Sequence, residues 1–143
     1  MNIEHRAFVL LQQHNQLLLL RDAQHPSHLK LPGGHVEQGE SFLQAALREV
    51  EEEVAIELAA SALTPLHLVE FSWEGKQYTS MLFLATAWEG NPVNVLPGEH
   101  SELLWVDATN LPTAGLFPPT RQAMVLGLQG TFYSEWRKDR GNG

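Results

Sequence analysis

Three glutamates at positions 49, 52 and 53 could bind a divalent cation together. If they lie on a helix, Glu52 and Glu53 follow Glu49 by three and four positions, so the three carboxylates fall within an arc of about 100°. Like charges at this spacing repel by a few tenths of a kcal/mol per pair, unless solvent or a cation separates them. Spacing alone therefore leaves two interpretations open, a metal site and a solvated acidic face.

An apolar stripe accompanies the glutamates at helical spacing. It consists of Leu43, Leu47, Val50 and Val54. Such a stripe buries one side of a helix. We therefore expect it to turn the three carboxylates toward the opposite side.

A glycine-rich turn precedes this helix. Gly33 and Gly34 follow Pro32, and Gly39 stands just before Glu40 and Ser41, where the helix should begin. Paired glycines let a backbone carbonyl or amide approach a ligand closely, although an ordinary tight turn would also explain them.

The segment 34–56 resembles the Nudix box, G-x5-E-x7-R-E-U-x-E-E-x-G-U, where U is aliphatic. Eight of its nine defined positions match: Gly34, Glu40, Arg48, Glu49, Val50, Glu52, Glu53 and Ile56. Ala55 stands where the family has glycine. If that position needs a left-handed backbone, alanine costs roughly 1 kcal/mol, but no side-chain ligand is lost.

The resemblance implies an α+β fold, the Nudix α/β/α sandwich with a mixed sheet, and hydrolysis of a nucleoside diphosphate linked to another group. It implies that Glu49, Glu52 and Glu53 hold one to three Mg²⁺ or Mn²⁺ ions, with the Gly34 carbonyl as a further ligand. Hard cations prefer such oxygen ligands. The general base would be Glu49 or Glu52, or a residue of a later loop.

Other residues of the box receive supporting roles from the same resemblance. Arg48 would pair with Glu37 of the preceding loop and thereby orient the metal ligands, as outer partners of metal sites do. Glu40 would either cap the helix or join the metal shell through a water.

Outside the box, the loop 97–102 is the most informative segment. By the same resemblance, Glu99 is expected to be a further metal ligand or base, with Glu102 in reserve; a solvated acidic loop is the alternative. His100 could assist a leaving group, but a single loop histidine is more often a polar surface residue.

Cations and aromatic rings are the candidates for substrate contacts. Arg21 and Lys30 flank the loop before the box and could bind phosphates. For each of them, a solvated position on the protein surface is an equally good interpretation. The aromatic residues that could stack on a base are Phe71, Trp73, Tyr78, Phe83 and Phe117; core packing is the safer interpretation for most of them.

Composition sets consistent limits. The 143 residues suffice for one domain over 1–143. Seventeen acidic residues against nine basic ones give a formal charge of −8, which argues against a broad nucleic-acid surface. There is no cysteine, no signal-peptide pattern and no apolar run long enough to span a membrane, so a cytoplasmic location is the default expectation.

Alternating and periodic patterns predict the remaining elements. Strands are expected at 7–12, 16–21, 66–73, 77–88 and 103–106, with turns at His14-Asn15 and Glu74-Gly75. Helices are expected at 41–54 and 118–128, the second with two prolines at its start.

The sequence thus predicts a metal-dependent Nudix pyrophosphohydrolase that converts a nucleoside triphosphate, oxidised or deoxy forms included, to the monophosphate and pyrophosphate. Alternatives are hydrolysis of ADP-ribose or another nucleotide sugar, of dinucleoside polyphosphates or of capped RNA ends, and a non-catalytic nucleotide sensor. The expected partner is a small nucleotide, and a homodimer is compatible with the resemblance.

Overall fold

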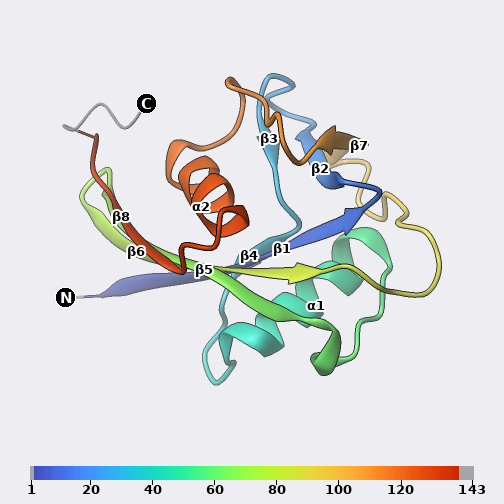
Figure 1. Cartoon of the computed structure of the whole chain (residues 1–143), viewed down its shortest axis with the longest axis horizontal. Helices are drawn as coiled ribbons and strands as arrows, with labels where there is room; N and C mark the ends of the chain where they lie inside the picture. Colours follow the sequence, from blue (N-terminus) through green and yellow to red (C-terminus); the bar gives the residue numbers. More distant parts are fainter. Residues whose placement is uncertain (1, 139–143) are drawn as a thin grey trace.

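The computed structural model describes residues 2–138 and places two helices on opposite faces of a mixed sheet (Figure 1). The strands are β1 (Ile3–Gln13), β2 (Gln16–Asp22), β3 (Leu29–Lys30), β4 (Gly33–His35), β5 (Thr64–Trp73), β6 (Lys76–Ala85), β7 (His100–Asp107) and β8 (Tyr133–Trp136). The helices are α1 (Phe42–Val54) and α2 (Pro118–Leu128), with a short 3₁₀ turn, η1 (Ala60–Ala62), after α1. None of the helices within residues 2–138 is long and apolar enough to span a membrane.

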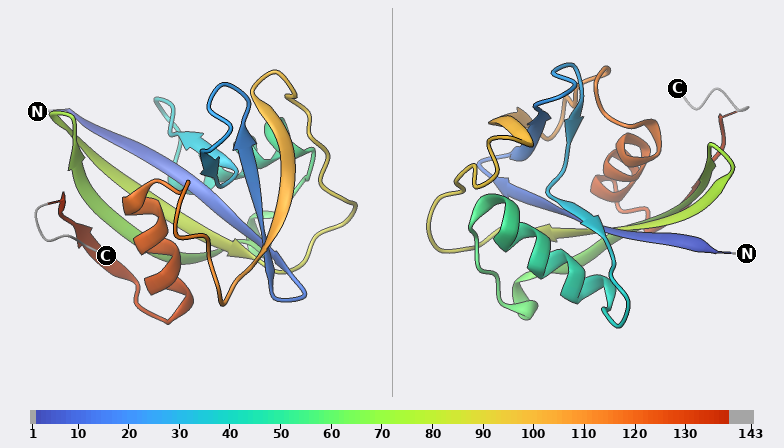
Figure 2. Two further views of the ribbon diagram at one scale, coloured as in Figure 1. Left: turned by 90° about the horizontal axis from the view of Figure 1, so that it is seen from above. Right: turned by 180° about the vertical axis from the view of Figure 1, so that it is seen from behind.

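Strand β1 is the centre of the sheet. It runs parallel to β6 and antiparallel to β2 and β4, and the main strand order is β3-β2-β1-β6-β5-β8, with β7 paired to β2. The sheet curves strongly, and α1 and α2 lie on its two sides (Figure 2). Because β4 pairs with β1 and leads into α1, the start of the box is fixed to the middle of the sheet.

Two hydrophobic cores explain this layering. Alternate residues of β1 face opposite ways, so Val9 packs with Val50 of α1 while Leu10 packs with Met124 of α2. The leucines of β2 divide between the two cores in the same way. Strands buried on both faces read as continuous apolar runs, as 17–20 does here.

The fold class and most predicted elements are confirmed. The residues at both hairpin turns have positive φ, at His14 and Asn15 (50° and 64°) and at Glu74 and Gly75 (48° and 79°), as tight two-residue hairpins require. The strand expected at 77–88 ends at Ala85, because its last pairings are Thr64 with Leu84 and Leu11 with Ala85. Strand β7 begins at His100, three residues earlier than expected.

Candidate active site

Helix α1 has defined ends. Ser41 caps it by accepting a hydrogen bond from the Gln44 amide at 3.0 Å, and the Gln44 side chain accepts from the Ser41 amide in return. The helix-cap role considered for Glu40 is therefore wrong. At the other end Ala55 adopts a left-handed conformation (φ 60°, ψ 31°), and its amide donates to the Glu51 carbonyl. The family glycine is thus replaced by alanine at a position that does require this backbone.

Gly34 brings the backbone against a box carboxylate. A Cβ atom at this position would lie 2.5 Å from Oε2 of Glu49, closer than side chains tolerate. Gly33, at φ 149°, has no room for a Cβ either, because the backbone of β1 lies beside it. The two glycines therefore let the backbone of β4 lie close to β1 on one side and to the Glu49 carboxylate on the other, which an ordinary turn would not require.

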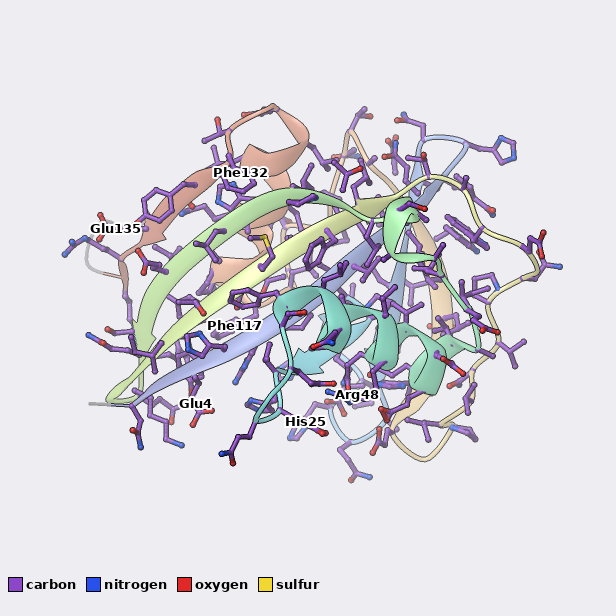
Figure 3. All side chains as sticks on the ribbon, turned by 90° about the horizontal axis from the view of Figure 1, so that it is seen from below. Glu4, His25, Arg48, Phe117, Phe132 and Glu135 are labelled. Carbon is purple, nitrogen blue, oxygen red and sulfur yellow. The ribbon has the colours of Figure 1, made fainter. Side chains whose placement is uncertain are left out.

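Arg48 gathers the carboxylates around it. Its Nε and Nη2 donate to the two oxygens of Glu40 at 2.8 and 3.0 Å, and its Nη1 donates to Glu49 and to Glu52, each at 2.8 Å. Glu37, the predicted partner, lies 3.6 Å from Nη1 and is largely exposed. The predicted ion pair with Glu37 is therefore present, and Glu40 adds a closer, two-pronged contact from the residue just before the helix cap. Figure 3 labels Arg48 on α1.

Glu53 points into the protein. It is 5% exposed; its Oε1 accepts from the Gly33 amide at 2.7 Å, and its Oε2 lies 3.6 Å from Nε2 of His100. Burial raises the pKa of Glu53 to about 8. The expectation that all three carboxylates face away from the buried side is therefore wrong for Glu53, because its side chain lies between Gly33 of β4 and His100.

The donor atoms suit a divalent cation, although the side chains are divided. Within residues 2–138, no three acidic or histidine side chains are gathered as a ready metal cluster. Glu49 and Glu52 share Arg48, while Glu53 turns to Gly33. Nevertheless, Glu53 is a buried carboxylate with no Lys or Arg ion-pair partner among the described residues, and Gly34 leaves space beside Glu49 that any side chain would fill. Carboxylate and carbonyl oxygens fit a hard cation, so the predicted ligand set stays a prediction that the donor chemistry supports.

The loop before β7 contributes one buried and several exposed residues. His100 is completely buried, its two ring nitrogens have no hydrogen-bond partner among the described residues, and burial lowers its pKa. The surface role expected for His100 is thus wrong. Glu99 is exposed and within electrostatic reach of Glu53, which leaves its predicted role open.

Arg21 is engaged elsewhere. Its Nε donates to Glu102 at 2.7 Å and its Nη1 to the Pro26 carbonyl at 2.6 Å. Arg21 and Glu102 thus form an ion pair with each other. Arg21 is not among the residues that line the cavity at the glycine turn.

A cavity of about 310 Å³ opens beside the glycine turn on the α2 side of β1. It is lined by Arg6, Phe8, Leu29, Lys30, Leu31, Gly33, Gly34, His35, Phe117 and Thr120. Lys30, one of the two cations considered for a phosphate contact, lines this cavity, and so does Phe117, one of the five aromatic residues considered for stacking on a base. Sequence reasoning missed Arg6, because the first strand was expected to begin at residue 7. It also missed Phe8, which lay inside the expected strand but was not considered as a substrate contact. Alternation along a longer strand would have put both residues on one side of β1.

The cleft is lined by glycines and cations and has carboxylates behind it, an arrangement that suits a phosphorylated ligand bound through a cation. The chain belongs to the NUDIX domain family, which matches residues 2–125. It is therefore a Nudix pyrophosphohydrolase acting on phosphoanhydride bonds, and this family is generally divalent-metal dependent.

Several relatives are similar over most of the chain. The 8-oxo-dGTP diphosphatase of Escherichia coli (strain K12) is 31% identical over 131 residues, covering 85% of this chain and 92% of that protein. The asymmetrical bis(5'-nucleosyl)-tetraphosphatase of Sus scrofa is 36% identical over 96 residues, covering 64% of this chain and 63% of that protein. The crystal structure of a MutT NUDIX hydrolase from Burkholderia pseudomallei superposes with a TM-score of 0.76 at 28% identity, covering 87% of this chain and 98% of that one.

Proposed function

We propose that this protein hydrolyses a nucleoside triphosphate to the monophosphate and pyrophosphate with the help of Mg²⁺ or Mn²⁺. One observation carries the proposal. Gly34 lines the cleft on one side and abuts the Glu49 carboxylate on the other, so a polyphosphate in the cleft lies directly beside the acidic face of α1.

The box residues would hold the cation. Glu49, Glu52 and Glu53, with the Gly34 carbonyl, offer oxygen ligands, and Glu99 could add one from its loop. A bound divalent ion polarises the phosphoryl group and lowers the pKa of an attacking water.

The chain's own residues then have separate tasks. Burial raises the pKa of Glu49, which suits a general base, and Glu49 lies nearer to the cleft than the exposed Glu52. Arg48 holds both carboxylates in position through its Nη1. Lys30 stands on the cleft wall within electrostatic reach of Glu49 and Glu53, where it would bind the substrate's phosphates.

The relatives guide the choice of substrate. The 8-oxo-dGTP diphosphatase of Escherichia coli covers 85% of this chain and the tetraphosphatase of Sus scrofa 64%, which favours a purine triphosphate, in oxidised or deoxy form. The tetraphosphatase of Sus scrofa supports dinucleoside polyphosphates as the second candidate.

Product analysis tests the proposal. The protein is incubated with Mg²⁺ and a panel of ordinary and oxidised (d)NTPs, ADP-ribose and diadenosine polyphosphates, and the products are separated by chromatography. Monophosphate and pyrophosphate from a triphosphate support the proposal. AMP from ADP-ribose alone, ATP from diadenosine tetraphosphate alone, or binding without turnover would replace it by the nucleotide-sugar, dinucleoside or sensor function.

A further inference from the structure

Arg6 lines the cleft at the level of His35. On β1, Ala7 faces the α1 core, whereas Arg6 and Phe8 face α2 and line the cavity with Phe117. In register, Phe8 lies opposite Gly33 and Arg6 opposite His35. Two residues of strand separate Arg6 from the level of Gly33 by about 7 Å.

The guanidinium of Arg6 has no acceptor within residues 2–138. Its carbon lies 4.7 Å from the centre of the Tyr78 ring, and it forms neither an ion pair nor a hydrogen bond among the described residues. Its Nε is buried and unpaired. Arg21 and Arg121, by contrast, donate to a carboxylate and to a backbone carbonyl.

An unpaired buried donor is costly, so the surroundings of Arg6 indicate an acceptor that the described chain does not supply. Lys30, on the same cavity wall, is within electrostatic reach of Glu49 and Glu53, whereas the guanidinium of Arg6 lies over the Tyr78 ring. Phe8 and Phe117, both half-buried, add two aromatic rings to the cavity wall. A guanidinium fork can bind either a phosphate or the edge of a base, and the aromatic rings around Arg6 favour the base, which can stack on them.

We propose that Arg6 selects the base of the substrate by donating to the carbonyl oxygen at C6 of a guanine-type purine. This inference rests on the proposed function, since it takes the phosphates to lie beside Glu49 and Lys30. The guanidinium has donors only, so it matches guanine and hypoxanthine, which present an acceptor at C6. Adenine presents an amino group there and leaves Arg6 unpaired. A well-made contact of this kind distinguishes bases by about tenfold to a hundredfold.

Binding of three monophosphates tests the inference without requiring turnover. The dissociation constants of GMP, IMP and AMP are measured by tryptophan fluorescence, because Trp73 contacts Phe117 in the cleft (4.7 Å between ring centres). Arg6→Met removes the donors and keeps an apolar stem over Tyr78, Arg6→Lys keeps the charge without the planar fork, and Lys76→Gln removes an exposed charge outside the cavity.

We expect the wild type and Lys76→Gln to bind GMP and IMP at least about tenfold more tightly than AMP. Arg6→Met should lose that preference by weakening GMP and IMP while AMP changes little, and Arg6→Lys should fall between. An equal loss for all three nucleotides would assign Arg6 to the phosphate, and an absence of preference in the wild type would also overturn the inference.

The two proposals fail separately. If the Arg6-dependent preference is found but no triphosphate is turned over, the base-reading role stands and the reaction is wrong. If triphosphates are cleaved with no dependence on the base, the reaction stands and the role of Arg6 is wrong.

Discussion

Replacing Glu53 by glutamine should stabilise the metal-free protein at alkaline pH and abolish its activity. Glutamine has the same shape, and its Oε1 can still accept from the Gly33 amide. The change removes only the ability to carry a buried negative charge, which the folded protein without a cation disfavours and a bound cation requires.

The magnitude follows from the pKa of Glu53, which burial raises from 4.5 to about 8. Below pH 4.5 the carboxyl is protonated in both folded and unfolded chains, so it has no differential effect. As the pH rises, the unfolded chain ionises first and the folded chain keeps its proton until about pH 8. The free energy of unfolding therefore falls through this interval, by up to ~5 kcal/mol, and the glutamine variant escapes that loss.

The assay is urea denaturation at pH 5 and pH 8 with a chelator, and again with Mg²⁺. With the chelator, Glu53→Gln should exceed the wild type in stability at pH 8 by a few kcal/mol and by much less at pH 5. Mg²⁺ should stabilise the wild type, by about 2.7 kcal/mol at a hundred times its dissociation constant, and leave the variant nearly unchanged. Glu51→Gln, an exposed change on the same helix, should stay within about 0.5 kcal/mol of the wild type.

Two results would refute this reasoning. A variant less stable than the wild type at pH 8 without metal would show that the ionised carboxylate is not a cost to the fold. Equal stabilisation of wild type and variant by Mg²⁺ would show that Glu53 is not a ligand.

Three further substitutions test the surroundings of the carboxylates. Ala55→Gly removes about 1 kcal/mol of left-handed backbone strain, but it also raises the conformational entropy of the unfolded chain, which offsets up to a similar amount. Urea denaturation should therefore show a free energy of unfolding that rises by between zero and about 1 kcal/mol. A clear fall in that free energy would contradict the strain. Arg48→Lys loses the two-pronged contact with Glu40, so kcat/KM should fall about 10- to 100-fold with an unchanged circular dichroism spectrum, and near-normal turnover would show that Arg48 does not position the carboxylates. Ser41→Ala removes the cap on the Gln44 amide and should lower the free energy of unfolding by about 1 kcal/mol in thermal melts, whereas no change would mean that water replaces the cap.

The sequence predicted best where local rules decide the structure. Helix α2 was predicted with its observed bounds, because Pro118 and Pro119 fit only its first turn and Gly130 follows its end. The left-handed backbone considered at Ala55 was confirmed for a similar reason, since a helix often ends in that conformation.

Features that depend on distant contacts were not visible in the sequence. Helical spacing put Glu53 beside Glu49, but its burial depends on Gly33 and on His100, which lies 47 positions later. Strand β4 contains two glycines, which have low strand propensity, and it exists because β1 pairs with it. Arg6 fell outside the expected strand because the start of β1 is set by pairing with β4 and β6, which follow much later in the sequence.

The most direct test of the whole account is the set of products formed from one purine nucleoside triphosphate, measured by chromatography with Mg²⁺, with a chelator, and with Glu53→Gln. We expect equal amounts of monophosphate and pyrophosphate from the wild type with Mg²⁺, and no products in the other two cases. Diphosphate with free phosphate, or undiminished turnover with the chelator or the variant, would contradict it.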